Sequence, residues 1–185
     1  MKDRWNYAGL GQVQYGDEAS YQAAADWLDW PGWIVEDWGC GCAFARRFFR
    51  HATYIGIDGS QNDYADICRV ELDARFSKSD GLLMRHVLDH NEGWRAVLNR
   101  AASCCQRRMV IDLFIPFGPV TRIVDRTSPT EMRYPDIVNM QFRREDLMEE
   151  LLEYSVRQIN TSRDFLMLCE KKPVAKNQSG PTVTL

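Results

Sequence analysis

Val-Glu-Asp-Trp-Gly-Cys-Gly at residues 35–41 decides the fold, together with Tyr-Ile-Gly-Ile-Asp-Gly-Ser at residues 54–60. The first stretch indicates a buried strand that enters a glycine turn and then a helix. The second indicates a short apolar strand that ends at Asp58. Glycines allow a backbone to approach a ligand closely, and a carboxylate at a strand end accepts hydrogen bonds from ribose hydroxyls. The two stretches therefore predict an edge of a parallel sheet that holds a nucleoside cofactor.

The spacing of the glycine turn separates two kinds of nucleotide cofactor. A dinucleotide-binding fingerprint requires glycines in the pattern Gly-x-Gly-x-x-Gly, and Phe44 stands at the third glycine position. Residues 37–43 instead read Asp-x-Gly-x-Gly-x-Ala. With Asp58 behind it, this loop resembles the first motif of the class I S-adenosylmethionine-dependent methyltransferases, usually Asp-x-Gly-x-Gly-x-Gly, and the resemblance extends over roughly residues 33–115. Ala43 departs from the motif, and we expect it to fit the first turn of a helix.

The resemblance implies S-adenosylmethionine as the cofactor and S-adenosylhomocysteine as the product. The glycine loop and the following helix N-terminus would receive the methionine part, Asp58 the ribose, and Asp73 the adenine amino group. Asp37 would hold the methionine ammonium directly or through water, or would brace the loop by accepting backbone N–H bonds. Asp58 and Asp73 have the alternative of being surface acids. The expected cofactor contacts are Asp37, Gly39, Cys40, Gly41, Asp58, Gly59, Ser60, Asp73, Ala74, Arg85 and His86.

A cluster of polar residues follows the fourth expected strand, in the run from residue 84 to residue 91, Met-Arg-His-Val-Leu-Asp-His-Asn. The resemblance places this segment beside the sulfonium and the methyl group to be transferred. Histidine is the side chain best suited to accept a proton near neutral pH, so His86 or His90 is a candidate general base. In the alternative reading His86 packs on the cofactor, and His90, Asp89 or Asn91 caps the next helix.

The same segment bears on the methyl acceptor. It reads Arg-His-Val-Leu, whereas exocyclic-amine methyltransferases of nucleic acids carry Asn/Asp-Pro-Pro-Tyr/Phe there, and cytosine C5 enzymes carry Pro-Cys. The net charge is −3 and no basic stripe contains interleaved aromatics, so nucleic acid is not an expected partner. We therefore expect a small-molecule or sugar acceptor. Its expected contacts are Tyr15, Asn91, Arg122 and Tyr134.

Composition favours one compact domain. The chain has 185 residues, of which 45% are apolar and 26% charged, as in an ordinary globular protein. No apolar run approaches the ~20 residues that span a bilayer, and the first residues lack an apolar secretory stretch, so we expect a cytoplasmic protein without a membrane partner, and a homodimer is possible. The expected divisions are a domain at 1–172, made of an N-terminal helical cap (1–32), a cofactor-binding core (33–115) and a substrate-side loop, helix and hairpin (116–172), followed by a mobile tail (173–185).

The six cysteines do not have the spacing of a metal site. Cys40 and Cys42 lie in the glycine loop, Cys104 and Cys105 are adjacent, and no Cys-x-x-Cys pair is present. Zinc sites in proteins use such pairs, or histidines at a similar spacing. We therefore expect reduced, mostly buried thiols and no metal.

Strands alternate with helices along the chain. The expected helices are 17–29, 42–50, 92–105 and 144–154, and the expected strands are 33–38, 54–58, 67–72, 81–85, 109–114, 156–160 and 165–169. Residues 116–140 contain three prolines after Pro116 and no clean periodicity, so we expect a long loop there. The alternation predicts an α/β protein with a Rossmann-like, mainly parallel sheet, helices on both faces and an antiparallel C-terminal hairpin.

Three other functions remain open at this stage. Cys42 and Ala43 in the loop, and the short chain, allow a non-catalytic protein that binds the cofactor or has lost it and acts through a protein partner. An enzyme could also degrade S-adenosylmethionine without donating its methyl group to an acceptor. A nicotinamide-dependent enzyme is the least favoured, because Phe44 replaces the third glycine.

Overall fold

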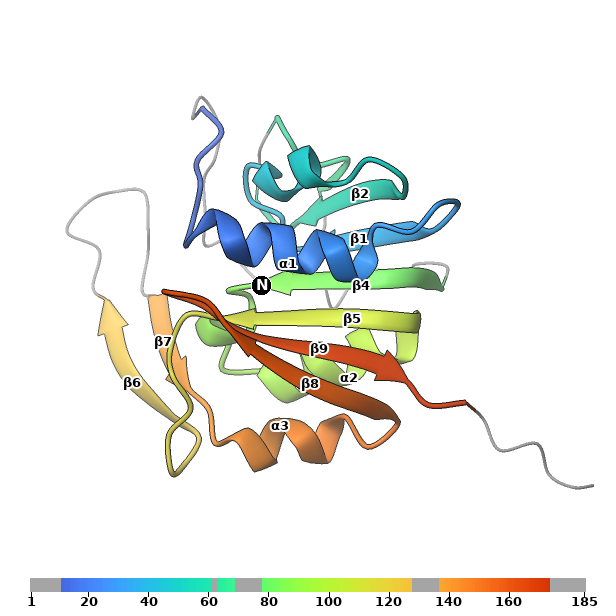
Figure 1. Ribbon diagram of the computed structural model, residues 1–185. Coiled ribbons are helices and arrows are strands. Elements are labelled where there is room, and N and C mark those ends of the chain that lie inside the picture. Colours follow the sequence, from blue (N-terminus) through green and yellow to red (C-terminus); the bar gives the residue numbers. More distant parts are fainter. Residues whose placement is uncertain (1–10, 61–62, 69–77, 128–136, 174–185) are drawn as a thin grey trace, which may run out of the picture.

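The computed structural model describes residues 11–60, 63–68, 78–127 and 137–173 (Figure 1). Its elements, in chain order, are α1 (Glu18–Leu28), β1 (Ile34–Trp38), the 3-10 helix η1 (Phe44–Phe48), β2 (Thr53–Asp58), β3 (Ile67–Cys68), β4 (Ser79–Arg85), the 3-10 helix η3 (Leu88–His90), α2 (Trp94–Cys104), β5 (Cys105–Leu113), β6 (Arg122–Thr127), β7 (Ile137–Gln141), α3 (Arg144–Glu150), β8 (Tyr154–Asn160) and β9 (Phe165–Lys171).

Seven strands of the described chain form one sheet in the order β3-β2-β1-β4-β5-β9-β8. The first five in this order are parallel, and β9 is antiparallel to both β5 and β8. The chain builds outward from β1 in one direction and then returns to add β4 and β5 on the other side, so the strand order reverses between β1 and β4 (Figure 1). Ligands of open parallel sheets lie beyond the carboxyl ends of the strands at such a reversal. Asp37 and Arg85, near the ends of β1 and β4, border that position.

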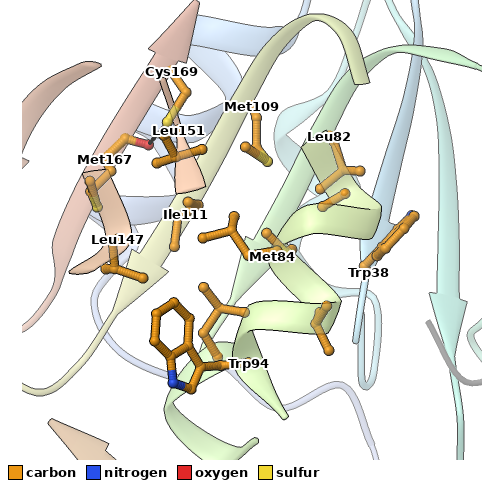
Figure 2. Close-up of a cluster of buried hydrophobic side chains, with 14 of the residues drawn as sticks. Trp38, Leu82, Met84, Trp94, Met109, Ile111, Leu147, Leu151, Met167 and Cys169 are labelled. Carbon is orange, nitrogen blue, oxygen red and sulfur yellow. Dashed lines mark hydrogen bonds between the residues drawn. The ribbon is translucent and has the colours of Figure 1, made fainter. Parts of the chain in front are cut away.

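Helices cover both faces of the sheet, as the sequence predicts. One buried cluster joins α1 and η1 to the sheet and includes Leu28, Val35 and Leu83. A second, larger cluster joins α2 and α3 to the opposite face, where Trp94 and Leu147 meet residues of β4, β5 and β9 (Figure 2). Neighbouring residues of one strand thus serve different cores, because successive side chains of a strand point to opposite faces. The predicted α/β fold with an antiparallel C-terminal hairpin is confirmed.

The first helix forms where the sequence places it. Asp17 accepts a hydrogen bond from the Ser20 amide at 2.9 Å, which caps the N-terminus. Leu28 and the alanines of the same face are buried against the sheet. A side-chain carbon at Gly81 of β4 would lie 3.2 Å from the nearest Leu28 methyl, so glycine at this position allows the helix to approach the strand closely.

The helix expected at 42–50 is wrong in type and length. The structure has a turn followed by the 3-10 helix η1, and Ala43 at its N-terminus has φ 50° and ψ 36°, the left-handed conformation. Ala43 therefore does not occupy a helical first turn, and it adopts a conformation that glycine tolerates much better than alanine. The short 3-10 helix also leaves no α-helix N-terminus directly behind the glycine loop.

The loop expected at 116–140 is also partly wrong. β6 and β7 form a separate antiparallel two-stranded sheet, in which Ile123 lies opposite Met140, and β7 packs beside η3. This places the hairpin next to the segment that follows β4. The intervening residues 128–136 lie outside the described chain.

The remaining predicted elements are present with shifted bounds. The helix expected at 144–154 ends at Glu150, and β8 begins at Tyr154, two residues before the expected strand. Only Ile67–Cys68 of the strand expected at 67–72 is described, and most of the tail expected at 173–185 lies outside the described residues. None of the described helices is long and apolar enough to cross a membrane.

Candidate functional site

The glycine loop lies at the carboxyl end of β1 and is fixed to β2. The amides of Gly39 and Cys40 donate to the Ile57 carbonyl at 2.8 and 3.1 Å. Gly39 and Gly41 have φ angles of 71° and 53°, so both positions use the left-handed region that glycine enters without steric cost. The turn places Gly39, which is half-buried, and Gly41, which is buried, directly after the end of β1.

Asp58 is buried, with 6% of its surface exposed, and it is bonded to the loop. One carboxylate oxygen accepts the Gly41 amide at 2.7 Å, and the other accepts the Ser60 amide at 2.8 Å together with the Ser60 hydroxyl. The reading of Asp58 as a surface acid is therefore wrong. Each oxygen has two lone pairs, so the same carboxylate can brace the loop and still accept a hydrogen bond from a ligand. Gly59, between the two bonded residues, is half-buried.

Asp37 is buried at the end of β1 and is only partly hydrogen-bonded. The Tyr54 hydroxyl donates to its Oδ2, whereas Oδ1 has no hydrogen-bond partner among the described residues. Burial raises the pKa of Asp37 to about 7, although the Tyr54 hydrogen bond and the Arg85 charge act in the opposite direction. The predicted loop-bracing bonds from backbone amides are absent from the described hydrogen bonds of Asp37. A buried acceptor without a partner, next to an open glycine turn, fits a cationic group of a ligand.

Cys40 fills the space behind the loop and shows no sign of reactivity. Its thiol donates to the Gly41 carbonyl at 3.7 Å, and a side-chain carbon at Gly56 would come within 3.0 Å of its sulfur. Burial, with the nearby Asp37 and Asp58 charges, raises the pKa of Cys40. A thiol with a raised pKa is a poor nucleophile, so Cys40 contributes shape to this edge of the sheet.

On the other side of the strand reversal, Arg85 joins two buried carboxylates. Its Nε donates to Asp112 Oδ2 at 2.7 Å, and its Nη2 donates to Asp164 Oδ2 at 3.3 Å. The side chains of Arg85, Asp112 and Asp164 are 7%, 0% and 1% exposed. Burial raises the pKa of Asp112 to about 6, while the Arg85 and His86 charges act to lower it.

Arg85 also holds the segment that precedes α1. Its Nη2 donates to the Tyr15 carbonyl at 3.0 Å and to the Ser20 hydroxyl at 2.9 Å. The guanidinium carbon lies 3.6 Å from the centre of the Tyr21 ring, whose hydroxyl accepts the Tyr15 amide. The Nε and Nη2 donors of Arg85 are thus engaged by protein groups. The sequence predicts Arg85 at the cofactor; the structure shows its guanidinium binding the N-terminal segment to β4 and β5, and a cofactor contact of Arg85 stays a prediction.

Three side chains that can serve as metal ligands lie close together: His86, Asp112 and Asp164. Their ligand atoms lie within 4.8 Å of one another. The Arg85 guanidinium, however, already contacts both carboxylates and supplies positive charge between them. A cation would have to compete with this guanidinium, so we assign the group as an ion-paired cluster.

The two candidate catalytic histidines lie on the same aromatic ring. The rings of His86 and His90 are each centred 5.2 Å from the ring of Phe114. His86 Nε2 lies 3.3 Å from Asp164 Oδ1, and His90 Nδ1 lies 3.1 Å from the Val138 carbonyl of β7. His90 therefore contacts the β6–β7 hairpin, and the described hydrogen bonds do not show it capping α2.

The expected acceptor contacts fall in different places. Asn91 Oδ1 accepts the Gly93 amide at 2.9 Å, just before α2, and Arg122 is exposed at the start of β6. Tyr15 is half-buried, and its backbone is held by Arg85. The structure brings Tyr15 close to the Arg85 cluster but shows no contact between Arg122 and that cluster. Asp73, Ala74 and Tyr134 lie outside the described residues.

Three residues of this edge were not identified from the sequence: Tyr54, Asp112 and Asp164. Asp112 carried a usable signal, because a carboxylate inside the apolar run of β5 must find a partner when it is buried. Tyr54 is one of the buried residues of β2, and a buried tyrosine is ordinary in a strand, so nothing in the sequence marked its contact with Asp37. Asp164 is a turn aspartate between β8 and β9, and such residues are common in turns for local reasons.

Comparisons with protein-family models and with curated proteins find no match. Solved structures do match. The 1,6-didemethyltoxoflavin-N1-methyltransferase of Burkholderia thailandensis, crystallised with its substrate and S-adenosylhomocysteine, is 16% identical with a TM-score of 0.63, over 85% of this chain and 80% of the other. The magnesium protoporphyrin IX methyltransferase of Synechocystis PCC 6803, with bound S-adenosylmethionine, is 18% identical with a TM-score of 0.59, over 90% and 88%.

A third match is the N-terminal domain of EvdMO1, crystallised with S-adenosylhomocysteine and D-fucose. It is 13% identical with a TM-score of 0.55, over 91% of each chain. These identities are low, so the matches establish the fold and leave the chemistry to the residues of this chain. The chain has the fold of the class I S-adenosylmethionine-dependent methyltransferases.

Proposed function

We propose that the protein is an S-adenosylmethionine-dependent methyltransferase that acts on a small-molecule or sugar acceptor. The observation that carries this proposal is the edge formed by the left-handed glycines at 39 and 41 and the buried Asp37 Oδ1, which has no partner among the described residues. This edge lies at the strand reversal of a methyltransferase fold, where ligands of such sheets bind.

The residues of this edge fit the parts of the cofactor. Asp37 Oδ1 would accept an N–H of the methionine ammonium, and the turn at Gly39 and Gly41 would lie against the methionine part. Gly41 and Ser60 use three of the four lone pairs of Asp58, and the one that remains on Oδ2 would accept a ribose hydroxyl, as a charge-assisted hydrogen bond in a buried setting. Asp73 with Ala74 remains our proposal for the adenine amino group, on the basis of the family resemblance alone.

The chemistry of methyl transfer needs few protein groups. The cofactor supplies a methyl group already activated on a sulfonium. An oxygen, nitrogen or carbon lone pair of the acceptor would take this methyl group, and the cofactor would leave as S-adenosylhomocysteine with the electron pair of the broken S–CH3 bond on sulfur. The acceptor proton must leave, and a histidine is suited to take it. We propose that His86 accepts this proton in preference to His90, because His86 lies at the end of β4 and its ring contacts the Asp164 carboxylate.

A small acceptor is supported by the matched solved structures and by the position of the β6–β7 hairpin. The matched proteins include one with bound 1,6-didemethyltoxoflavin, a magnesium protoporphyrin IX methyltransferase, and one crystallised with D-fucose. The β6–β7 hairpin is separate from the main sheet and carries Arg122. It packs beside η3, and its Val138 carbonyl contacts His90. We propose that this hairpin contributes one wall of the acceptor site, with Asn91 at its base.

Product analysis tests the proposed function. The purified protein would be incubated with S-adenosylmethionine and a panel of sugars and small metabolites, and the products identified by mass spectrometry. Equal amounts of S-adenosylhomocysteine and a methylated acceptor support the proposal. Adenosyl fragments that form without any acceptor indicate degradation of the cofactor instead. Binding of the cofactor without any product across the panel favours the non-catalytic alternative.

A further inference from the structure

We propose that Asp164 is the residue that sets the tautomer and orientation of the His86 imidazole for proton transfer, an inference that rests on the proposed function. Asp164 lies in the turn between β8 and β9, and its Oδ1 is 3.3 Å from His86 Nε2. The two residues are 78 positions apart in the chain. The β8–β9 hairpin thereby contributes a side chain to the carboxyl edge of β4.

The backbone of His86 is held in an unusual conformation. Its φ angle is 54°, in the left-handed region that residues with a side chain rarely adopt. Its amide donates to the Asp112 carbonyl at 2.9 Å, and its ring packs against the edge of Phe114. Strained backbone of this kind persists where the surroundings hold it, and it is concentrated at functional sites. In this conformation His86 Nε2 lies beside Asp164 Oδ1.

The Asp164 carboxylate is negatively charged and can therefore accept a hydrogen bond from His86. Burial acts to raise its pKa, but hydrogen bonds from His86 and Ser20, and the His86 and Arg85 charges, hold the pKa at about 2. Its second oxygen accepts the Asp17 amide at 3.3 Å and the Arg85 Nη2 at 3.3 Å. The carboxylate is therefore ionised and fixed from two further directions.

An ionised carboxylate beside Nε2 selects one tautomer of neutral His86. The carboxylate can only accept, so Nε2 must carry the proton and Nδ1 must hold the lone pair. Among the described residues, no hydrogen bond is made by Nδ1 of His86. In the transfer step the acceptor proton moves to Nδ1, and the Nε2–H bond to Asp164 stabilises the imidazolium that forms. The proton stays on His86 and does not pass to Asp164.

The tautomer can be measured without an acceptor. In protein labelled with ¹⁵N-histidine, the imidazole nitrogen shifts of His86, assigned with His86→Ala, distinguish the two neutral forms. We expect the Nε2-protonated form in the wild-type protein, and a mixed or reversed population in Asp164→Asn, whose amide can donate as well as accept. An Nδ1-protonated His86 in the wild-type protein would overturn the proposal, whatever the protein catalyses.

Kinetics with the acceptor found by product analysis supply the second test. We expect Asp164→Asn to lower kcat at least ~10-fold, since a positioned general base contributes on the order of 10²–10⁴-fold, while the Kd for S-adenosylmethionine stays within about twofold. Ser162→Ala is the matched control, because it removes a hydrogen bond from the same turn to Asp17 without touching His86. An equal loss of kcat in Ser162→Ala, or an unchanged kcat in folded Asp164→Asn, contradicts a positioning role. Failure of the wild-type protein to bind S-adenosylmethionine would instead refute the proposed function.

Discussion

The candidate site lies at the carboxyl ends of the parallel strands and has two sides. The contacts that hold each side together differ greatly in how far apart their residues are in the sequence. On the glycine-loop side (residues 37–41 and 58–60), the bonds that fix the site join residues 17 positions apart, Asp58 with Gly41 and Tyr54 with Asp37. On the arginine side (Arg85, His86, Asp112 and Asp164), the ion pairs join residues 27 and 79 positions apart. One side is a local motif, and the other is an assembly of two separate strands and a turn.

This difference assigns different tasks to the two sides. The glycine-loop side combines the unpartnered Asp37 Oδ1 with a turn of left-handed glycines, and this combination fits a ligand site, whereas the unpartnered Asp112 Oδ1 of the arginine side belongs to a carboxylate that is already ion-paired to Arg85 through Oδ2. The arginine side has the Nε and Nη2 donors of Arg85 committed to protein groups and buries two carboxylates around one guanidinium. Substitutions on the arginine side should therefore affect folding most strongly, and those on the glycine-loop side should affect ligand binding most strongly.

The largest effect should come from Arg85→Met. Removal of the guanidinium leaves Asp112 and Asp164 buried without their shared cation, and breaking a buried ion pair in this way costs about 3–5 kcal/mol. Chemical denaturation measures the loss in the free energy of unfolding. Arg126→Met is the control, because both side chains of its ion pair with Glu92 are more than half exposed, at 58% and 51%, and such pairs contribute about 0–1 kcal/mol. Similar losses in the two variants would contradict the assigned role of Arg85.

Asp58→Ala should act mainly on the ligand. If Asp58 accepts a ribose hydroxyl, its loss should weaken binding of S-adenosylmethionine by about 1–3 kcal/mol. Calorimetric titration measures this change. Ser60→Ala removes only one of the bonds that Asp58 accepts and keeps the carboxylate, so its effect should be smaller. An unchanged affinity in folded Asp58→Ala would remove Asp58 from the cofactor site.

Asp37 should make stability depend on pH. Its folded pKa of about 7 lies above the ordinary value of 3.8, so between these pH values the folded carboxyl binds a proton that the unfolded chain has released. The ligand-free protein should therefore lose stability as pH rises from about 4 to about 7, by up to about 1.4 kcal/mol per pH unit from this group. Asp112, whose pKa is raised to about 6, contributes with the same sign.

Asp37→Asn isolates this contribution. The free energy of unfolding, measured by denaturation at several pH values in that window, should fall less steeply in the variant than in the wild-type protein. Tyr54→Phe sharpens the test, because the Tyr54 hydrogen bond lowers the Asp37 pKa, and its loss should extend the fall to higher pH. Parallel curves for Asp37→Asn and the wild-type protein would show that Asp37 is ionised in the folded state across this range.

Ala43→Gly should have the smallest effect. Relief of the left-handed conformation favours glycine by about 1–2 kcal/mol, whereas loss of a buried methyl costs about 0.8 kcal/mol and glycine adds a further entropic cost of about 0.5–1 kcal/mol. These contributions nearly cancel, so denaturation should show a change within about 0.5 kcal/mol. Ala45→Gly is the matched control inside η1, where no strain is relieved, and it should destabilise by about 1–2 kcal/mol.

Most of the fold could be predicted because its signals are local. The apolar run around Val35, the turn glycines and the acid at the end of β2 all lie within residues 35–58. The helix at 42–50 was wrong because its apolar pattern does not distinguish an α-helix from a 3-10 turn, and the left-handed Ala43 prevents a regular helical start. The β6–β7 hairpin was missed because residues 116–140 show no clean periodicity, and Pro129 and Pro135 lie in the segment that separates its strands.

The residues of the candidate site also differ in how far the sequence could predict them. The glycine-loop residues were identified from the sequence because one motif carries them, although their roles remain proposals. The bonding of Asp58 to the loop and the single contact of Asp37 depend on tertiary packing. Asp164 could not be identified, because a turn aspartate 79 positions from Arg85 carries no local sign of its partner. Long-range ion pairs are a property of the assembled sheet.

Calorimetric titration of the wild-type protein with S-adenosylmethionine and S-adenosylhomocysteine, with NAD as the control ligand, tests the central claim most directly. The glycine turn, Asp37 and Asp58 predict that both adenosyl ligands bind with a Kd on the order of micromolar and that NAD does not bind. Absence of binding by either adenosyl ligand, in protein shown to be folded, would contradict the claim that this edge of the sheet is a cofactor site.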